Sequence, residues 1–312
     1  MPDAPTAPPT SSTDARASIG VIGGSGLYSL FAEARSVSIP TPYGETSSPI
    51  TLGELGGRTV AFLTRHGVDH SSPPHLINYR ANIWALKSLG VKAIISSAAV
   101  GGVSSDYPPS TLVLTDQFID RTWGRADTFF DGASVQHLAA ADPFCPELHA
   151  RAGEALTAAG EAFAPAGTVV VVQGPRFSTR AESLWYRAAG AHTVNMTLVP
   201  EVTLAAELNM GTVNLSFVTD ADAGLAPLPP GAATSSAVAS SDEEAVSAEL
   251  VFRRLKEAQP RIVAAIETII RAIPDDYEPR ELIPASAVAA VLAQPAAQPT
   301  HASTLPSATA GA

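Results

Sequence analysis

The chain is 312 residues long, 46 % hydrophobic and 16 % charged, with a formal net charge of −11 at pH 7. This size supports one large folded domain or two small ones, and the acidic balance argues against nucleic acid or an anionic membrane as a partner, since both require a basic surface. The single cysteine, Cys145, excludes an intramolecular disulfide framework and a cysteine zinc cluster, and no apolar run approaches the ~18 residues of a membrane span.

Both ends of the chain have a biased composition. Residues 1–17 are rich in Pro, Ala, Ser and Thr and lack the apolar region of a secretory signal, and residues 281–312 are rich in Ala and Pro. Neither segment has a pattern that could bury a core, so we predict that both are disordered. The folded domain is expected over residues 18–280, with a low-complexity insert at 225–241, in a cytoplasmic protein.

The domain opens with a strand, residues 18–22, which runs into the glycine-rich turn GGSGLY at residues 23–28. Glycines let the backbone approach a ligand closely, and successive N–H groups with the Ser25 hydroxyl form a concavity for anions. The dinucleotide motif GxGxxG would need a third glycine at position 29, which is Ser29. The turn therefore favours a phosphate or ribose-phosphate loop over a dinucleotide site.

The next buried-looking strand, Thr59–Leu63, is followed by Arg65 and His66. A guanidinium offers paired donors in fixed geometry, which suits an oxyanion. An isolated arginine more often forms a surface ion pair, but the position after a strand favours an anion site here. His70 and His75 follow closely, yet their spacing fits no common zinc pattern, so we expect no metal.

An amphipathic helix is predicted at residues 78–89, with Trp84 in the core. The strand Ala93–Ser97 then leads into an expected loop of small residues, Ala98–Gly102. The segment 123–146 carries little secondary-structure signal. A loop this long in a compact domain is usually functional or interfacial.

The central stretch alternates strand-like and helix-like segments. Strands are predicted at 168–172, 192–194 and 212–218, with helices at 179–189 and 200–209 between them. This alternation predicts a single α/β domain with a central mixed, mostly parallel twisted sheet flanked by helices. Polar residues follow each strand, and ligands of open α/β sheets bind beyond the carboxyl ends of the strands. We therefore expect the site there.

Ten short motifs occur in order along the chain: GGSGLY, TPYG, RHG, NYRANIWALKSLG, DQFIDRT, DPFCP, GPRFSTRAES, NMT, PEVTLA and TDAD. Together they closely resemble the trimeric purine nucleoside phosphorylase family, and within it the methylthioadenosine phosphorylase branch. The likeness covers residues 19–225 and resumes over the helical pattern at 243–274.

The resemblance implies phosphorolysis without a cofactor, in which the co-substrate, inorganic phosphate, attacks C1′ of a nucleoside and releases a purine and a pentose 1-phosphate. The implied phosphate-binding residues are Ser25, Arg65, His66, Ala98, Ala99 and Thr197. Met196 is then expected against the ribose, with Phe177 and Ser178 in the base pocket. The 5′ pocket would be lined by Ala248, Val251 and His137, the last from a neighbouring subunit of a homotrimer.

Asp220 and Asp222 are the expected chemical centre. Two acids one residue apart more often form a solvated turn, but these follow a buried strand beside other polar strand ends. Expelling a purine requires neutralising the negative charge that develops on its ring. An ordinary Asp is protonated in only about one molecule in a thousand at pH 7, so burial next to a second carboxylate should raise the pKa of Asp220. Asp220 would donate to N7, and Asp222 would accept from a 6-amino group.

Three residues or regions depart from the family pattern. Ala98 stands where the branch commonly has a threonine that contacts phosphate, the aromatic residues that usually flank the two acids are missing, and Ala248 is smaller than the usual valine. The expected substrate is S-methyl-5′-thioadenosine. Alternatives are a 5′-deoxy- or 5′-halo-5′-deoxyadenosine, a 6-oxopurine nucleoside, or a non-catalytic nucleotide-binding role for the same fold.

Overall fold

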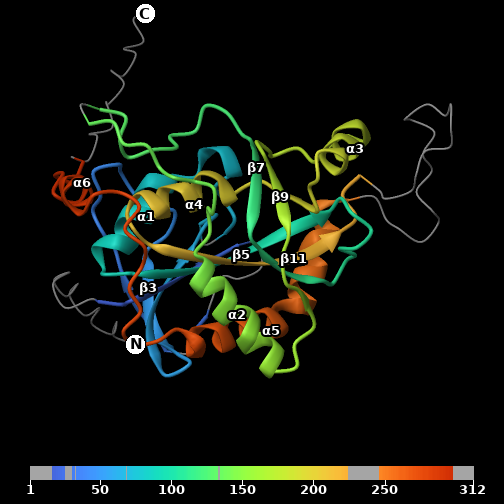
Figure 1. The fold of residues 1–312 in the computed structure, drawn as a ribbon, viewed down its shortest axis with the longest axis horizontal. Coiled ribbons are helices and arrows are strands. Elements are labelled where there is room, and N and C mark those ends of the chain that lie inside the picture. Colours follow the sequence, from blue (N-terminus) through green and yellow to red (C-terminus); the bar gives the residue numbers. More distant parts are fainter. Residues whose placement is uncertain are drawn as a thin grey trace, which may run out of the picture.

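A computed structural model of the chain describes residues 16–24, 30–31, 33–67, 69–132, 134–223 and 246–297 (Figure 1). The strands are β1 (Ile19–Gly23), β2 (Arg35–Val37), β3 (Ile50–Leu55), β4 (Arg58–Thr64), β5 (Ala93–Gly102), β6 (Leu112–Thr115), β7 (Gln117–Arg121), β8 (Phe163–Ala164), β9 (Thr168–Val172), β10 (Thr193–Asn195) and β11 (Gly211–Asp220). The helices are α1 (Tyr79–Ser88), α2 (Pro146–Ala158), α3 (Arg180–Ala188), α4 (Leu198–Glu207), α5 (Ala248–Ala272) and α6 (Ala285–Leu292), with a 3-10 turn at Pro74–Leu76.

The strands form one sheet in the order β2-β3-β4-β1-β5-β10-β9-β7, with β11 pairing β5 and β6, and β8 pairing β6. Six pairings among the described strands are parallel and four are antiparallel. All ten residues of β11 are buried, as expected for a strand that is covered on both faces. The predicted α/β fold with a mixed, mostly parallel sheet is confirmed.

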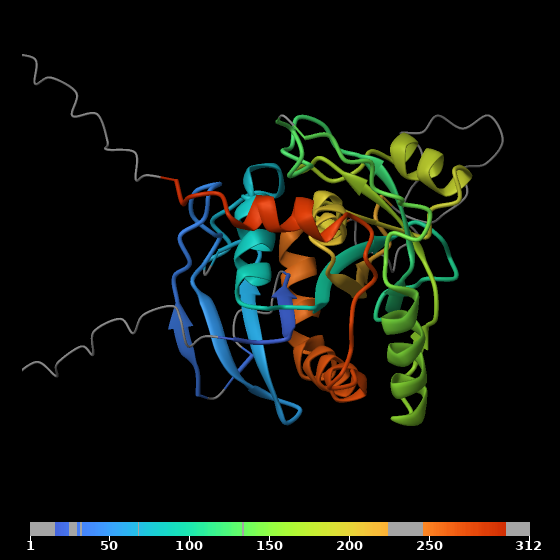
Figure 2. The same cartoon turned by 60° about the vertical axis from the view of Figure 1, so that its left-hand side comes forward.

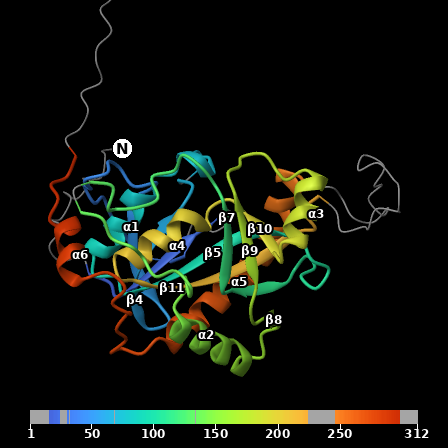
Figure 3. The ribbon, with the colours of Figure 1, turned by 45° about the horizontal axis from the view of Figure 1, so that its top comes forward.

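Helices cover the two faces of the sheet. In Figure 1, α1, α4 and α6 lie on one face and α2 and α5 on the other. Alternate side chains of β1 enter the two cores, because Ile22 packs with α1 and α4 whereas Val21 packs with α2 and α5. Figure 3 shows α3 beside β9 and β10, away from α1 and α6.

Strand β5 changes its neighbour along one edge, and this change creates the space for a site. Ala93–Ser96 pair with β1, whereas Gly101 and Gly102 pair with β10. The other edge pairs with β11 over nearly its whole length. Residues 97–100 therefore face a gap between β1 and β10, at a switch point of the kind where α/β proteins bind ligands. The expected loop Ala98–Gly102 was wrong, because these residues continue the strand.

The tail prediction was also wrong over residues 281–297. Helix α6 lies against α1 and α4, as Figure 2 shows, and buries Val288 and Val291. Trp84 Nε1 donates to the Val291 carbonyl at 3.1 Å, and Asn209 Nδ2 donates to the Ile283 carbonyl at 2.7 Å. The composition looked featureless, but alanine favours helix and valines three apart share one helix face.

The prediction that residues 1–17 are disordered was wrong at Ala17. Ala17 is buried, and its N–H donates to the Leu89 carbonyl at 3.1 Å. Residues 1–15, the insert at 225–241 and residues 298–312 lie outside the described residues. Among the described residues, no helix combines the length and apolar character needed to cross a lipid bilayer.

Candidate active site

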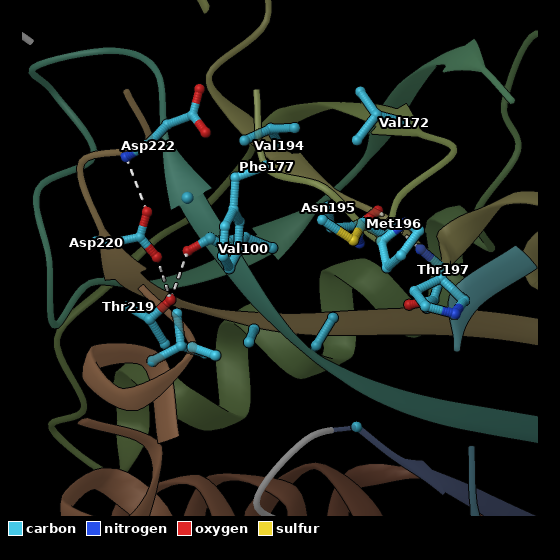
Figure 4. A pocket seen from close by; sticks show the side chains of 18 of the residues that line it. Val100, Val172, Phe177, Val194, Asn195, Met196, Thr197, Thr219, Asp220 and Asp222 are labelled. Carbon is cyan, nitrogen blue, oxygen red and sulfur yellow. Dashed lines mark hydrogen bonds between the residues drawn. The ribbon is translucent and has the colours of Figure 1, made fainter. Parts of the chain in front are cut away.

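A cavity of ≈ 260 Å³ lies at the gap beside β5 (Figure 4). Its size is near the lower end of the roughly 300–1,000 Å³ typical of small-molecule sites. Twelve predicted site residues line it: Arg65, His66, Ala98, Ala99, Phe177, Ser178, Met196, Thr197, Asp220, Asp222, Ala248 and Val251. Ser25 lies outside the described residues. His137 is exposed and is not among the lining residues.

The two carboxylates stand at the end of β11 and are buried. Asp220 accepts hydrogen bonds on both oxygens, from the Thr219 hydroxyl at 2.7 Å and from the Asp222 N–H at 2.8 Å (Figure 4). The hydroxyls of Ser183 and Ser178 lie within hydrogen-bonding reach of the Asp222 carboxylate. The pair is therefore held by neighbouring hydroxyls as well as by its own backbone.

Burial raises the pKa of both carboxyl groups. The pKa of Asp222 reaches about 6, because burial and the charge of the neighbouring Asp220 outweigh the hydrogen bonds from the Ser183 and Ser178 hydroxyls and the Ala223 N–H. For Asp220, burial also raises the pKa, against the two hydrogen bonds that it accepts and the charge of Arg254. Sequence reasoning expected this shift for Asp220, and the structure shows that Asp222 shares it.

Gly101 of β5 lies directly against the carboxylates. A Cβ atom at this position would lie 3.0 Å from Asp220 Oδ1, 3.1 Å from Val194 Cγ1 and 3.2 Å from Asp222 Cβ. These distances are shorter than ordinary van der Waals contacts. A side chain at this point of the strand would therefore force the neighbouring groups, including the acids, to shift by a few tenths of an ångström.

Arg65 is buried and engages a carboxylate that sequence reasoning missed. Its Nε donates to Glu201 Oε2 at 2.5 Å, its Nη2 to Glu201 Oε1 at 2.7 Å, and its Nη1 to the Ser97 carbonyl at 2.9 Å. Glu201 is equally buried and lies in the predicted PEVTLA helix. An acidic residue within an otherwise apolar helix was the available signal for a buried partner.

His66 is neutral at pH 7, because burial lowers its pKa to about 4. Its Nδ1 lies 3.0 Å from the Ser72 carbonyl, which can only accept, so Nδ1 carries the proton and Nε2 is an acceptor. His70 stacks near it, with ring centroids 4.2 Å apart, and burial also lowers the pKa of His70. This end of the cavity thus presents neutral imidazoles beside an ion pair.

One buried polar atom of the cavity, Asn195 Nδ2, has no hydrogen-bond partner in the described part of the chain. Buried polar groups are nearly always paired in folded proteins. An unpaired amide donor in a cavity that also holds two buried carboxyl groups indicates a polar ligand. Among the described residues, no group of three His, Cys, Asp or Glu side chains is placed to hold a metal ion.

The start of α5 supplies an apolar wall. Ala248 and Val251 line the cavity, as predicted, and Phe252 joins them. The Phe252 ring meets the edge of His70 with a centroid distance of 5.3 Å. Sequence reasoning missed Phe252, although residues 248, 251 and 252 follow the i, i+3, i+4 spacing of one helix face.

Solved structures with the same fold include two methylthioadenosine phosphorylases. One, from an Antarctic soil metagenomic library, superposes with a TM-score of 0.73 and 40 % sequence identity over 84 % of this chain and 88 % of its own. The other, from Schistosoma mansoni in complex with adenine, has a TM-score of 0.75 and 30 % identity over 89 % and 98 %.

Related sequences are named as phosphorylases of the same kind or as purine nucleoside phosphorylases. The S-methyl-5′-thioadenosine phosphorylase of Thermofilum pendens is 45 % identical over 83 % of this chain and 93 % of its own. That of Mycolicibacterium smegmatis is 51 % identical over 66 % and 78 %, and a purine nucleoside phosphorylase of Streptomyces coelicolor is 51 % identical over 67 % and 78 %. The family model of the phosphorylase superfamily matches residues 18–266, a span that contains the whole cavity, and the chain belongs to that superfamily.

Proposed function

We propose that the protein catalyses the phosphorolysis of S-methyl-5′-thioadenosine. Inorganic phosphate attacks C1′, the bond from C1′ to N9 breaks, and adenine and 5-methylthioribose 1-phosphate are released. The observation that carries this proposal is the buried pair Asp220 and Asp222 within a cavity that also holds Arg65. The names of the relatives and structural neighbours support the same reaction.

The two carboxyl groups would together form hydrogen bonds with the purine base. With one proton between them, one group donates to N7 as negative charge develops on the leaving base, and the other accepts from the 6-amino group. We assign the donor role to Asp220 and the acceptor role to Asp222. Phe177 supplies a ring for the base, and Ser178 lines the same cavity.

Phosphate would bind at the opposite end, near Arg65, His66 and Thr197, with the Met196 side chain against the ribose. Three of the five N–H groups of Arg65 are used by Glu201 and Ser97, which leaves two for the anion. His66 Nε2 can accept from the hydroxyl of monohydrogen phosphate. Backbone at Ala98 and Ala99 completes the expected phosphate site.

The 5′ substituent would contact Ala248, Val251 and Phe252, an apolar surface suited to a methylthio group. The same surface suits a 5′-deoxy- or 5′-halo-5′-deoxyadenosine, which is the second candidate because the residue at position 248 departs from the family pattern in the 5′ region. We also propose a cytoplasmic homotrimer that acts in purine salvage without a cofactor, in which the exposed His137 completes a neighbour's 5′ pocket.

Adenine release from a panel of nucleosides, with and without phosphate, tests the proposal. We expect strict phosphate dependence and the highest kcat/KM with S-methyl-5′-thioadenosine. Undiminished adenine release in phosphate-free buffer would identify a hydrolase instead. A higher kcat/KM for the 5′-deoxy or 5′-halo compound would select the second candidate, and sedimentation analysis would report the oligomer.

A further inference from the structure

Arg125 occupies a place in the molecule that the reaction described above does not use. It lies in the long segment after β7, is partly buried, and its guanidinium reaches three separate parts of the chain. Five neutral acceptors surround it: the carbonyls of Val172, Gln173 and Val199, the side-chain oxygen of Gln173, and the Tyr79 hydroxyl.

The first part held by Arg125 is the end of β9. Nη2 donates to the Gln173 carbonyl at 3.0 Å and to the Val172 carbonyl at 3.4 Å, and Nε donates to Gln173 Oε1 at 3.2 Å. Val172 lines the cavity, and the chain continues from Gln173 into Phe177 and Ser178, which also line it. Arg125 thus fixes the origin of the segment proposed to hold the base.

The second part is the start of α4. Nη1 donates to the Val199 carbonyl at 2.5 Å. Val199 has φ −106° and ψ 130°, which are not helical values, so its carbonyl points away from the ordinary helix ladder and needs another donor. Val199 lies between Thr197, which lines the cavity, and Glu201, which holds Arg65. Arg125 thus also fixes the segment that presents the proposed phosphate site.

The third part is the start of α1 and, through Tyr79, the segment that precedes it. The Arg125 guanidinium lies 5.6 Å from the centre of the Tyr79 ring, with Nη1 3.4 Å from the Tyr79 hydroxyl. That hydroxyl donates to the Pro74 carbonyl at 2.9 Å, and Pro74 lines the cavity. One planar cation therefore ties together three cavity walls that are remote from one another in the sequence.

We propose that Arg125 is a positioning residue that holds residues 173–178, the proposed base segment, and residues 197–201, the proposed phosphate segment, in fixed relative positions. This proposal rests on the proposed function only for the identity of the two ligands. A guanidinium suits this task because its donors diverge in one plane at fixed angles, whereas a lysine ammonium is a point charge that cannot hold all of these acceptors in that geometry. Small displacements of such segments are costly, since about 1 Å of misplacement can lower a rate by 10²-fold.

The test compares Arg125→Lys with a matched control, Arg280→Lys. Arg280 also donates to two backbone carbonyls, those of Asp142 at 3.0 Å and Phe144 at 2.8 Å, but it does not line the cavity. We would measure melting temperature, kcat, and KM for nucleoside and for phosphate. In Arg125→Lys we expect both KM values to rise about tenfold or more, with kcat/KM lower by about 10²-fold. In Arg280→Lys we expect both KM values to stay within about twofold, whatever the change in melting temperature.

Equal kinetic constants for the two variants, or a rise in only one KM in Arg125→Lys, would overturn the proposal. Should Arg125→Lys fail to fold, Arg125→Gln, which keeps one planar donor group, is measured against Arg280→Gln with the same criteria. If the wild-type protein shows no phosphorolysis, the proposed function itself is refuted. If the wild-type protein is active and the Arg125 and Arg280 variants have the same kinetic constants, only the role of Arg125 is refuted.

Discussion

Arg65 and Glu201 form a buried bidentate pair at the wall of the cavity, with N–O distances of 2.5 and 2.7 Å. The pair removes most of the net charge that Arg65 would otherwise present to an anion. Its remaining N–H groups are directional donors held in place by the carboxylate and by the Ser97 carbonyl. Geometry, more than net charge, is what Arg65 contributes to this end of the cavity.

Arg65→Ala should therefore do more than remove a donor. The Glu201 carboxylate would stay buried and unpaired, which costs about 3–5 kcal/mol of the free energy of unfolding and repels phosphate. In the double variant Arg65→Ala/Glu201→Gln, we expect most of the stability to return while the KM for phosphate remains high. Urea denaturation and phosphate titration measure the two effects. An unchanged phosphate KM in either variant would remove Arg65 from the phosphate site.

Asp220→Asn keeps the shape of the side chain but removes its titratable proton. The loss of a general acid lowers turnover by about 10²–10⁴-fold, and we expect this fall with a 6-amino substrate. The amide can still donate to N7 or to a 6-oxo group, so the inosine analogue should suffer less, and the ratio of kcat/KM values should move toward it by about tenfold or more. Asp222→Asn is the matched control. A larger fall in that variant than in Asp220→Asn would transfer the donor role to Asp222.

The raised pKa of Asp222 predicts a dependence on pH. Below about pH 6 the Asp222 carboxyl is protonated, and above it the group is ionised. An ionised carboxylate accepts from the 6-amino group more strongly than a protonated carboxyl group, so kcat/KM should rise with pH through about 6 and fall again where Asp220 loses the proton that it donates to N7. Phosphate titrates in a similar range, but its contribution persists in Asp222→Asn. If the change in kcat/KM near pH 6 is the same in wild type and Asp222→Asn, it arises from the titration of phosphate and not from Asp222.

Gly101→Ala should lower activity with little effect on the fold. The added Cβ would press on Asp220 and Asp222 at 3.0–3.2 Å, and the shift of these groups by a few tenths of an ångström is expected to lower kcat/KM by up to about tenfold, less than the 10²-fold that a misplacement of about 1 Å can cost. Gly132→Ala is the control, because a Cβ at that position meets nothing within 4 Å. Wild-type kinetics in Gly101→Ala would show that the carboxylates tolerate displacement and do not require the close approach.

Deleting residues 285–312 should destabilise the protein, contrary to the expectation from composition. The deletion exposes the surface under Val288 and Val291 and removes the acceptor of the Trp84 indole, so we expect a loss of about 2–4 kcal/mol. Deleting only residues 298–312 is the control and should change stability little. The measurement is the midpoint of urea unfolding for the two deletion variants. Equal midpoints would show that α6 does not contribute to the stability of the domain.

The central strands β9 and β11 could be predicted from the sequence because each is a short β-branched run that ends in a polar cluster. Helix α1 could be predicted from its amphipathic pattern. The strands β2, β3, β7 and β8 were missed, because they lack that β-branched character. The neighbour of each strand could not be predicted, since β5 pairs with both β1 and β10 along one edge. Helix α6 was missed because alanine and proline counts say nothing of the spacing of its two valines.

The site residues could be predicted as a set because they follow strand ends and match the motifs of the family. Their partners could not be. Glu201 and Arg65 are 136 residues apart in the chain, and only the fold brings them together. The same holds for Arg125, whose acceptors are mainly backbone carbonyls. Every residue has such a carbonyl, so the sequence does not indicate which ones Arg125 contacts.

The gap beside β5 has a consequence for what can enter the cavity. An open sheet edge ordinarily invites the edge of another chain, with the risk of aggregation. Here the gap spans only residues 97–100, is closed at its two ends by β1 and β10, and has one carbonyl, that of Ser97, already taken by Arg65. A peptide strand cannot lie along so short an opening, whereas a compact molecule can. The length of the gap in the sheet thus limits the length of the ligand that can bind, before the chemistry of the cavity side chains has any effect.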